Sequence, residues 1–411
     1  MSARRIRLLF FLRETFPTSR VDVDVLFGRK LLERGHQIDF VMQAQDSGVP
    51  DSVQPWRSGQ VLIGRTDSAD GFMHRIRKHL LSIRHDLRCL RLARSDTYDA
   101  VQVRDKFMIA ALVAWVARRR GLRFFYWLSW PEPESQLSRA RQRTARYPLI
   151  ALMRGHLYDW LLYRWILPRA DHVFAQSEQM KRDLVARGVA PAKITPVPMG
   201  VDLADIPKTA HQPRPIEGRE IVIGYLGVIT AERQLVMLVD MLVELRRASV
   251  AARLLFVGDA QIPNDRLMIE ERARAQGVTD LVEITGFLPR AQALQRILAT
   301  DVALSPFYPT PILLSTSPTK LVEYLALALP VVANDHPEQR LALRESRAGL
   351  CVPWGARHFA RAVRWLARQP AEERRTMGER GREWVRAHRT YDHIASTVED
   401  AYLRVLATPL K

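Results

Sequence analysis

The stretch with the clearest chemical potential is residues 315–333, where a short polar segment leads into a predicted helix and then an apolar strand. Ser317 is a residue type that often caps a helix, and Pro318 suits the first helical position. The free N–H groups of a helix N-terminus, together with the helix dipole, bind anions such as a diphosphate. Lys320 adds a positive charge to this end of the helix, and Glu323 lies on the same helix face.

A carboxylate just beyond a diphosphate site can accept hydrogen bonds from the hydroxyl groups of a ribose. Thr319, Lys320 and Glu323 share one helix face and therefore predict a nucleotide site. An ordinary surface helix with a cap and an ion pair between Lys320 and Glu323 explains the same pattern. The residues alone do not separate these two interpretations.

This stretch resembles the donor-site motif of the family-four retaining glycosyltransferases. The resemblance rests on the run from Pro318 to Tyr324 and on the strand at residues 330–333. Further segments match the family in order and spacing: Ile223–Gly227, Phe256–Asp259, Gly286–Pro289, Ala170, Asp171, Ser177 and residues 199–202. The resemblance implies an enzyme of the GT-B fold that transfers a sugar from a nucleoside-diphosphate sugar to an acceptor.

The resemblance also implies roles for individual residues. Arg233 and Lys320 are the predicted catalytic cations, which offset the negative charge that develops on the departing diphosphate. Phe287 and Leu288 lie where the family reads the nucleobase, and Glu323 is expected to bind the ribose. The full set of predicted donor-binding residues is Gly227, Phe287, Leu288, Ser315, Thr316, Ser317, Thr319, Leu321 and Glu323.

The chain departs from the family's usual pattern in the predicted donor domain. Many members carry an earlier glutamate that contacts the donor sugar, and Ser315 stands at that position here. We expect Ser315 or Thr316 to supply the hydroxyl contacts instead. Val228 and Arg233 stand where the family often has Arg and Lys, which leaves Arg233 and Lys320 as the predicted cation pair.

The first half lacks the family's usual glycine-rich loop and its usual histidine. The loop at residues 15–20 instead contains a proline, hydroxyl groups and an arginine, and residues 126–134 contain two glutamates among aromatic residues. Aromatic faces pack on sugars, and carboxylates accept hydrogen bonds from hydroxyl groups. The predicted acceptor or cleft residues are Ser19, Arg20, Trp130, Glu132 and Glu134. A surface loop and an exposed proline-rich turn are the alternatives. No general base is assigned, because in a retaining mechanism the donor phosphate itself can take the acceptor proton.

The elements that must position these residues are βα units. Short apolar runs alternate with helical patterns, which predicts an α/β fold with parallel sheets. The predicted strands lie at residues 6–12, 37–42, 100–103, 124–127 and 172–175, and at residues 221–226, 253–257, 281–284, 302–304 and 331–333. We therefore expect two doubly wound, Rossmann-like domains that face each other across a cleft.

The predicted domain boundaries follow composition. The first domain spans residues 1–206, and the second, which binds the nucleotide sugar, spans residues 219–390. Residues 207–218 contain three prolines and few apolar side chains, so they form the predicted linker. Residues 391–411 are predicted to form a helix that crosses back to the first domain.

Composition limits the other classes of function. The two cysteines, Cys89 and Cys351, form neither a disulfide framework nor a metal site. No metal or cofactor is predicted beyond the nucleotide sugar as co-substrate. No apolar run reaches the ~20 residues that span a bilayer, and the basic, apolar start lacks a cleavage site for a signal peptide. The predicted location is the cytoplasm, on the inner face of the plasma membrane.

The formal net charge of +18 is unusual. Residues 73–94 and 139–169 each carry seven basic side chains against one acidic side chain, with apolar and aromatic residues between them. Such segments suit an anionic lipid surface. The predicted acceptor is therefore a lipid-linked or membrane-proximal glycan, in the synthesis of a cell-surface polysaccharide or glycolipid. Alternatively, both apolar stripes pack on the first domain's sheet.

Two other functions would explain part of the sequence. A nucleic-acid-binding protein would explain the charge, but no zinc-finger, RNA-recognition or helix-turn-helix signature occurs, so no nucleic-acid partner is predicted. A nucleotide-sugar epimerase of the same fold would need acid and base groups that face the sugar, and no convincing set is found.

Overall fold

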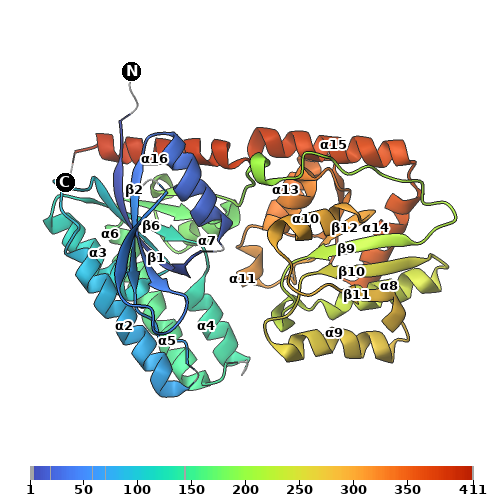
Figure 1. The fold of residues 1–411 in the computed structure, drawn as a ribbon, viewed down its shortest axis with the longest axis horizontal. Coiled ribbons are helices and arrows are strands. Elements are labelled where there is room, and N and C mark those ends of the chain that lie inside the picture. Colours follow the sequence, from blue (N-terminus) through green and yellow to red (C-terminus); the bar gives the residue numbers. More distant parts are fainter. Residues whose placement is uncertain (1–3, 19, 58, 70, 143–144, 410–411) are drawn as a thin grey trace. The chain divides into compact units, whose positions relative to one another are not determined.

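The computed structural model of the chain describes residues 4–18, 20–57, 59–69, 71–142 and 145–409. The chain forms two compact units (Figure 1). Unit 1 consists of Met1–Pro198 with Tyr391–Lys411, and unit 2 consists of Met199–Thr390. Each unit is built on a parallel sheet between layers of helices, which confirms the predicted α/β fold with two Rossmann-like domains.

Among the described residues, unit 1 contains an eight-stranded sheet in the order β3-β4-β2-β1-β5-β6-β7-β8. Neighbouring strands pair in parallel except β3 and β4, which form an antiparallel pair at one edge. The central strands are largely apolar and buried because helices cover both faces of a parallel sheet. The strands of this sheet are β1 (Arg7–Phe16), β2 (Gln37–Ala44), β3 (Ser52–Trp56), β4 (Gly59–Gly64), β5 (Ala100–Arg104), β6 (Arg123–Leu128), β7 (His172–Ala175) and β8 (Ile194–Pro196).

The helices of unit 1 include one long amphipathic helix, α2, and a helix, α16, that comes from the far end of the chain. A π-helical segment, η1 (Asp22–Lys30), follows β1. The remaining helical segments are α1 (Leu31–Glu33), α2 (Phe72–Leu90), α3 (Phe107–Arg119), α4 (Glu132–Arg141), α5 (Pro148–Trp160), η2 (Leu161–Ile166), α6 (Leu167–Arg169), α7 (Glu178–Ala186), η3 (Pro191–Lys193) and α16 (Tyr391–Ala407).

In the described part of unit 2, six strands form a fully parallel sheet in the order β11-β10-β9-β12-β13-β14. They are β9 (Ile221–Leu226), β10 (Ala252–Val257), β11 (Val282–Ile284), β12 (Val302–Ser305), β13 (Val331–Asn334) and β14 (Gly349–Val352). The helical segments are η4 (Leu203–Asp205), η5 (Ala231–Arg233), α8 (Val236–Arg247), α9 (Pro263–Ala275), η6 (Thr279–Leu281), α10 (Arg290–Leu298), α11 (Pro311–Leu314), α12 (Thr319–Ala326), α13 (Pro337–Ser346), α14 (Ala356–Arg368) and α15 (Ala371–His388).

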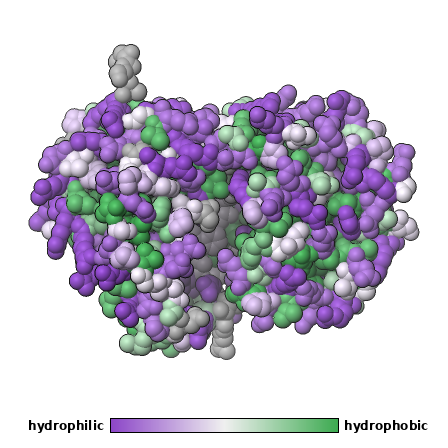
Figure 2. All heavy atoms as spheres, viewed as in Figure 1, coloured by the Kyte–Doolittle hydropathy of each residue, from purple (hydrophilic) through white to green (hydrophobic). Residues whose placement is uncertain are grey.

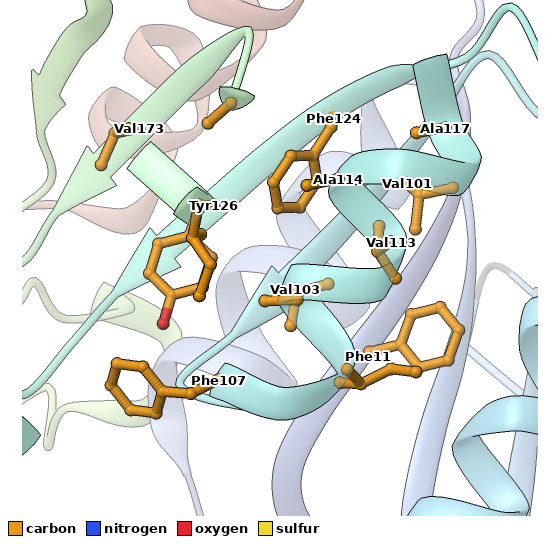
Figure 3. Close-up of a cluster of buried hydrophobic side chains, with 14 of the residues drawn as sticks. Phe11, Val101, Val103, Phe107, Val113, Ala114, Ala117, Phe124, Tyr126 and Val173 are labelled. Carbon is orange, nitrogen blue, oxygen red and sulfur yellow. The ribbon is translucent and has the colours of Figure 1, made fainter. Parts of the chain in front are cut away.

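The core of unit 1 has two layers because successive side chains of a strand point to opposite faces of the sheet. Phe11 of β1 packs with Val103, Tyr126 and Val113 on the face that α3 covers (Figure 3). Its neighbour Phe10 packs on the other face, against the side covered by η1 and α16. Burial of each large apolar side chain of this kind stabilises the fold by about 1.5–3 kcal/mol. The two core layers therefore hold the strands, and the polar residues at the strand ends, in place.

The chain passes from unit 1 to unit 2 at Pro198 and Met199, earlier than the predicted boundary at residue 206. The expected linker at residues 207–218 lies within unit 2, where the His211 N–H donates to the Leu327 carbonyl oxygen at 2.9 Å. Helix α16 packs in unit 1, and the Tyr402 hydroxyl donates to Gln102 Oε1 at 2.6 Å. Within residues 207–218, buried His211 thus attaches the segment to unit 2.

Candidate functional site

Two cations of unit 2 meet at one phenol group. Tyr225 lies in β9, Arg233 ends the short segment η5 that follows this strand, and Lys320 lies in the first turn of α12. Lys320 Nζ donates to the Tyr225 hydroxyl oxygen at 3.0 Å, and Arg233 Nη1 donates to the same oxygen at 2.9 Å. The structure therefore brings together the two predicted catalytic cations, although they lie far apart in the sequence.

This cation pair carries positive charge that its surroundings do not neutralise. Burial lowers the pKa of Lys320 to about 8, and the charge of Arg233 acts in the same direction. Burial raises the pKa of Tyr225, but Lys320 and Arg233 outweigh this effect and leave that pKa below its usual value. Among the described residues, neither cation forms an ion pair with a carboxylate. An anion at this place would relieve the repulsion between the two cations.

Two glycines give close access to the cations. Gly227 has a φ of +136°, and a Cβ atom there would lie 3.5 Å from Arg233 Nη1 and 3.6 Å from Lys320 Nζ. Gly258, with a φ of +143°, packs so tightly that a Cβ atom would lie 2.4 Å from the Gly227 carbonyl oxygen. The predicted donor residue Gly227 thus lies beside both cations, with its backbone held against the end of β10.

Helix α12 begins one residue later than predicted, and its cap differs. The helix starts at Thr319, Pro318 is the capping residue, and no side chain caps the first turn. The prediction that Ser317 is the N-cap is wrong, because Ser317 Oγ accepts a hydrogen bond from the Met199 N–H at 2.9 Å. This leaves the N–H groups of the first turn, around half-buried Thr319, without a side-chain partner, as an anion site requires.

Glu323 lies one turn beyond Lys320 in α12. Residues 320–326, which include Leu321, are all buried, so α12 is not the surface helix of the alternative interpretation. Glu323 pairs with Arg290 Nη1 at 2.5 Å instead of with Lys320. Arg290 is the first residue of α10 and is 39% exposed. Arg290 directly follows the predicted nucleobase segment at residues 286–289, so a residue next to that segment holds the Glu323 carboxylate in place.

The remaining predicted donor residues lie at two places in unit 2. Ser315 and Thr316 are buried directly after α11, and the Thr316 hydroxyl donates to the Leu313 carbonyl oxygen at 2.7 Å. This bond uses the Thr316 proton and leaves its oxygen free to accept another. Phe287 is 60% exposed, whereas Leu288 packs partly against the core beneath it. Phe287 therefore presents its ring at the surface of unit 2.

The predicted acceptor residues of unit 1 differ in their surroundings. Ser19 lies outside the described residues. Arg20 pairs with Asp22 at 3.2 Å, and Trp130 is half-buried. Glu134 accepts hydrogen bonds from the Tyr163 hydroxyl at 3.0 Å and from Arg187 at 3.3 Å, and its other carboxylate oxygen, Oε2, is buried without a hydrogen-bond partner.

Glu132 is the first residue of α4 and pairs with Arg13 of β1 at 3.1 Å. Burial opposes ionisation of Glu132, but Arg13 outweighs it and leaves the pKa of Glu132 below its usual value. Arg13 is 55% exposed. Glu132 is thus an ionised carboxylate that lies at the carboxyl ends of the strands, where ligands bind in doubly wound sheets.

Sequence reasoning missed a buried charged cluster next to Glu132. Arg104 is fully buried and pairs with Asp22 at 2.7 Å and with Glu14 at 3.5 Å. Asp105 has a φ of +52° and accepts a hydrogen bond from the Ser129 N–H at 3.0 Å and another from the Ser129 hydroxyl. Burial raises the pKa of Asp105. A charged dipeptide directly after a predicted buried strand was the signal that could have revealed this cluster.

Unit 2 also contains residues that sequence reasoning missed. Tyr225 interrupts an apolar strand with a hydroxyl group that needs a partner when it is buried. Arg290 follows the predicted nucleobase segment directly. Sequence spacing does not identify the partner of either residue, because Tyr225 and Arg290 contact α12 only in the folded chain.

Two kinds of feature are missing from the described residues. No group of three or more His, Cys, Asp and Glu side chains is placed there to hold a metal ion. No described helix is both long enough and apolar enough to cross a membrane.

Two family models match the chain in tandem. Residues 25–205 match the model described as Glycosyltransferase Family 4, and residues 208–384 match the model described as Glycosyl transferases group 1. No curated protein matches the sequence.

Several solved structures are similar to this chain over its length. Sucrose-phosphate synthase from Thermosynechococcus elongatus has 18% identity and a TM-score of 0.72, with 98% of this chain and 100% of that chain covered. HepE from Anabaena in complex with UDP has 12% identity and a TM-score of 0.66, with coverage of 97% and 100%. The UDP-forming α,α-trehalose-phosphate synthase from Burkholderia vietnamiensis has 14% identity and a TM-score of 0.66, with coverage of 97% and 99%. At these identities the likeness shows the fold alone.

Proposed function

The chain belongs to the group 1 glycosyltransferases of family-four type, and on this premise we propose that unit 2 binds the nucleoside diphosphate of a sugar donor. The family and the similar structures confirm the predicted GT-B fold and the predicted glycosyltransferase class. The donor class, the stereochemistry and the acceptor are our proposals.

One observation carries the donor proposal: Lys320 and Arg233 meet at the Tyr225 hydroxyl, next to the backbone of Gly227. A buried lysine and a half-buried arginine that share a phenol, with no carboxylate paired to either among the described residues, favour an anionic ligand. The first turn of α12, which no described side chain caps, adds N–H donors and the positive end of a helix dipole. The diphosphate of a nucleotide sugar has the charge and the acceptor oxygens for such a site.

The rest of the donor is assigned to the neighbouring predicted residues. Glu323 accepts hydrogen bonds from the ribose, and Phe287 and Leu288 contact the nucleobase. Ser315 and Thr316 contact the sugar in place of the family's earlier glutamate. The similar HepE structures contain UDP or UDP-glucose, which supports a nucleotide-sugar donor for this chain.

We assign a retaining transfer to this site. The bond between the anomeric carbon and the diphosphate oxygen breaks, and the acceptor oxygen bonds to the same face of that carbon. The acceptor proton passes to the departing phosphate. Arg233 and Lys320 stabilise the negative charge on this leaving group, and a charge-assisted contact of this kind contributes about 1.5–3 kcal/mol. The site then needs no resident metal or cofactor.

We propose a lipid-linked or membrane-proximal glycan as the acceptor, in the synthesis of a cell-surface polysaccharide or glycolipid. The enzyme would act in the cytoplasm, at the inner face of the plasma membrane. The support is the excess of basic residues, +18 in total, together with two basic segments of unit 1 that contain apolar residues. In unit 1, Glu132, Arg20 and Trp130 are the proposed acceptor contacts, and the ionised Glu132 would accept hydrogen bonds from acceptor hydroxyl groups.

The test is a thermal-stability screen of the wild-type protein with UDP-, ADP- and GDP-sugars, followed by product analysis. A donor that binds the folded state raises the melting temperature. With that donor and no acceptor, a transferase leaves most of the nucleotide sugar intact, whereas an epimerase converts it into the nucleotide sugar of the other configuration. If no nucleotide sugar stabilises the protein, the proposal fails.

A further inference from the structure

The two basic segments of unit 1 expose much of their apolar surface. Nearly half of the exposed large hydrophobic side chains among the described residues belong to residues 72–87 and 147–160. On α2 the exposed fractions reach 71% for Met73 and 62% for Leu80. On α5 they reach 76% for Leu149 and 73% for Met153. So many exposed apolar side chains on two helices indicate an interaction site, because the exposed hydrophobic residues of an ordinary surface are scattered singly.

The structure separates this patch from the apolar residues that stabilise the fold. Residues 72–80 of α2 are exposed on every side, and the helix contacts the core only through its second half, at His85, Asp86, Cys89 and Leu90. The stripe at Met73, Ile76, Leu80, Ile83 and Leu87 thus faces away from the core. The alternative interpretation, in which this stripe packs on the sheet, therefore does not hold for α2.

The same division holds for the second basic segment. Beyond α5, the residues of η2 pack inside unit 1: Leu162 and Ile166 are buried, and Trp165 Nε1 donates to the Ala111 carbonyl oxygen at 3.0 Å. Within α5, by contrast, Leu149, Met153 and Leu157 repeat at a helical spacing and are all exposed. Packing therefore explains residues 161–166, but it does not explain the exposed side chains of Leu149, Met153 and Leu157.

The two exposed helices begin next to each other. The rings of Phe72, at the start of α2, and Tyr147, just before α5, pack edge to face with centroids 6.1 Å apart. Further along, Arg154 of α5 lies close enough to His79 of α2 for their charges to interact. The space-filling view shows hydrophobic side chains among hydrophilic ones over this part of unit 1 (Figure 2). We name this surface, formed by residues 72–87 and 147–160, the α2–α5 face.

Charge identifies the partner of the α2–α5 face. Arg75, Lys78 and Arg84 of α2 have no carboxylate within ion-pair distance among the described residues. The single acidic residue of α2, Asp86, is bound to Lys106 at 2.7 Å and so does not offset them. A helix with apolar residues on one side and free cations beside them matches a surface of anionic headgroups over acyl chains. A protein partner would leave these cations unpaired unless it were itself acidic.

We propose that the α2–α5 face docks unit 1 onto an anionic lipid bilayer, with Met73, Leu80, Leu149 and Met153 inserted among the lipids. The cations Arg75, Lys78 and Arg84 contact the headgroups. This inference rests on the proposed function: the α2–α5 face is the surface that would bring the enzyme to a lipid-linked acceptor. It does not depend on the donor site, which lies in unit 2.

The experiment is vesicle co-sedimentation of the full-length protein. Vesicles of phosphatidylcholine with phosphatidylglycerol are compared with vesicles of phosphatidylcholine alone, at low and at high salt. Each basic residue near an anionic surface strengthens binding about fivefold. We expect strong binding to the anionic vesicles, weak binding to the neutral ones, and a loss of at least tenfold for R75E/K78E. The apolar variant L80Q/M153Q should lose binding at low and at high salt alike.

Matched variants in unit 2 control for charge and hydropathy. R361E/R368E changes the net charge by the same amount at exposed positions, and I262Q/L267Q removes two exposed apolar side chains. Both should bind vesicles as the wild type does. All variants should keep their melting temperature and their stabilisation by UDP, ADP or GDP, which separates a docking defect from misfolding and from failure of the donor site.

Two results would overturn the inference. One is equal vesicle binding by the wild type and R75E/K78E, or no preference of the wild type for anionic vesicles. The other is a wild-type dimer in light scattering that becomes monomeric in L80Q/M153Q without any vesicle binding, which would make the face an interface between two copies. If nucleotides fail to stabilise the wild type while vesicle binding follows the expected pattern, only the donor proposal falls.

Discussion

Arg233 and Lys320 donate hydrogen bonds to the same atom, the Tyr225 hydroxyl oxygen, at 2.9 and 3.0 Å. The two residues are brought together by β9 and α12, at the end of the sheet where parallel folds bind ligands. Two cations this close repel each other unless an anion lies between or beside them. Burial and, after it, this repulsion lower the pKa of Lys320, and the repulsion favours the proposed binding of a diphosphate.

The pH dependence of donor binding follows from the pKa of Lys320, which is about 8 in the free protein. A bound diphosphate favours the protonated lysine and raises this pKa, so binding takes up a proton. Affinity for a nucleotide sugar should be greatest below pH 8 and should fall as the pH rises through 8, by up to about tenfold per pH unit. Isothermal titration calorimetry from pH 6.5 to 9.5 measures it.

Two variants are the controls for this pH dependence. K320R carries a charge that does not titrate in this range and should flatten the curve. Y225F should keep the dependence, because it removes the phenol and not the lysine. A wild-type affinity that stays constant from pH 6.5 to 9.5 would contradict the assignment of Lys320.

Glu323 and Arg290 form an ion pair, and we expect the two residues to contribute differently to donor binding. If Glu323 accepts hydrogen bonds from the ribose, E323Q should weaken donor binding by about 1.5–3 kcal/mol, which is roughly ten- to a hundredfold. R290Q should weaken it less, because it loosens the carboxylate but leaves its oxygens in place. The comparison uses the Kd of the same nucleotide sugar. Equal affinity of E323Q and the wild type would remove Glu323 from the site.

The contact between Gly258 and Gly227 makes a prediction about stability. A Cβ atom at Gly258 would lie 2.4 Å from the Gly227 carbonyl oxygen, and its φ of +143° is strained for other residues. We expect G258A to lower the free energy of unfolding by more than about 2 kcal/mol and to displace Gly227 from the cations.

G277A is the matched control for G258A. Gly277 also has a positive φ, +62°, but a Cβ atom there would meet nothing within 4 Å. Its effect should be about 1 kcal/mol, from backbone strain alone. Urea unfolding of both variants gives the comparison, and equal losses would mean that the Gly258 contact is not tight.

The buried pair of Asp22 and Arg104 makes a prediction about unit 1. Burial raises the pKa of Asp22, but Arg104 and Arg20 outweigh it and hold that pKa well below its usual value. The stabilising contribution is therefore complete above about pH 4 and is lost as the pH falls through the lowered pKa. D22N leaves Arg104 without its nearest charge and should destabilise the protein by about 3–5 kcal/mol at pH 7.

The exposed Asp46 provides the control for D22N. D46N should change the free energy of unfolding by less than about 0.5 kcal/mol. Denaturant unfolding monitored at pH 7 and pH 3 checks both statements. The difference between D22N and the wild type should shrink at the lower pH, and a difference that grows there would contradict the ion pair.

Patterns local to the chain predicted the architecture well. The apolar runs at residues 6–12 and 221–226 gave the first strand of each sheet, since a strand buried on both faces must be apolar throughout. The hairpin of β3 and β4 was missed, because Pro55 and polar neighbours do not resemble a strand, and the pair lies at a sheet edge where exposure is tolerated.

Contacts between distant segments could not be predicted. Ser317 is an ordinary capping residue by type, but Met199, more than a hundred residues earlier, supplies the N–H that it accepts. Lys320 and Arg233 were identified singly through the family resemblance, whereas their meeting point on Tyr225 depends on the folded sheet. The stripe on α2 has the same spacing whether it faces the core or the solvent, so only the structure decides its exposure.

The most direct test of the donor site is the release of nucleoside diphosphate from the nucleotide sugar that stabilises the wild type best. The rate is measured for the wild type, K320M, R233Q and the exposed control R247Q. We predict that K320M and R233Q each lower kcat/KM about ten- to a hundredfold or more, because each removes a cation from the leaving group, and that R247Q matches the wild type. Release by K320M and R233Q at the wild-type rate would contradict the account.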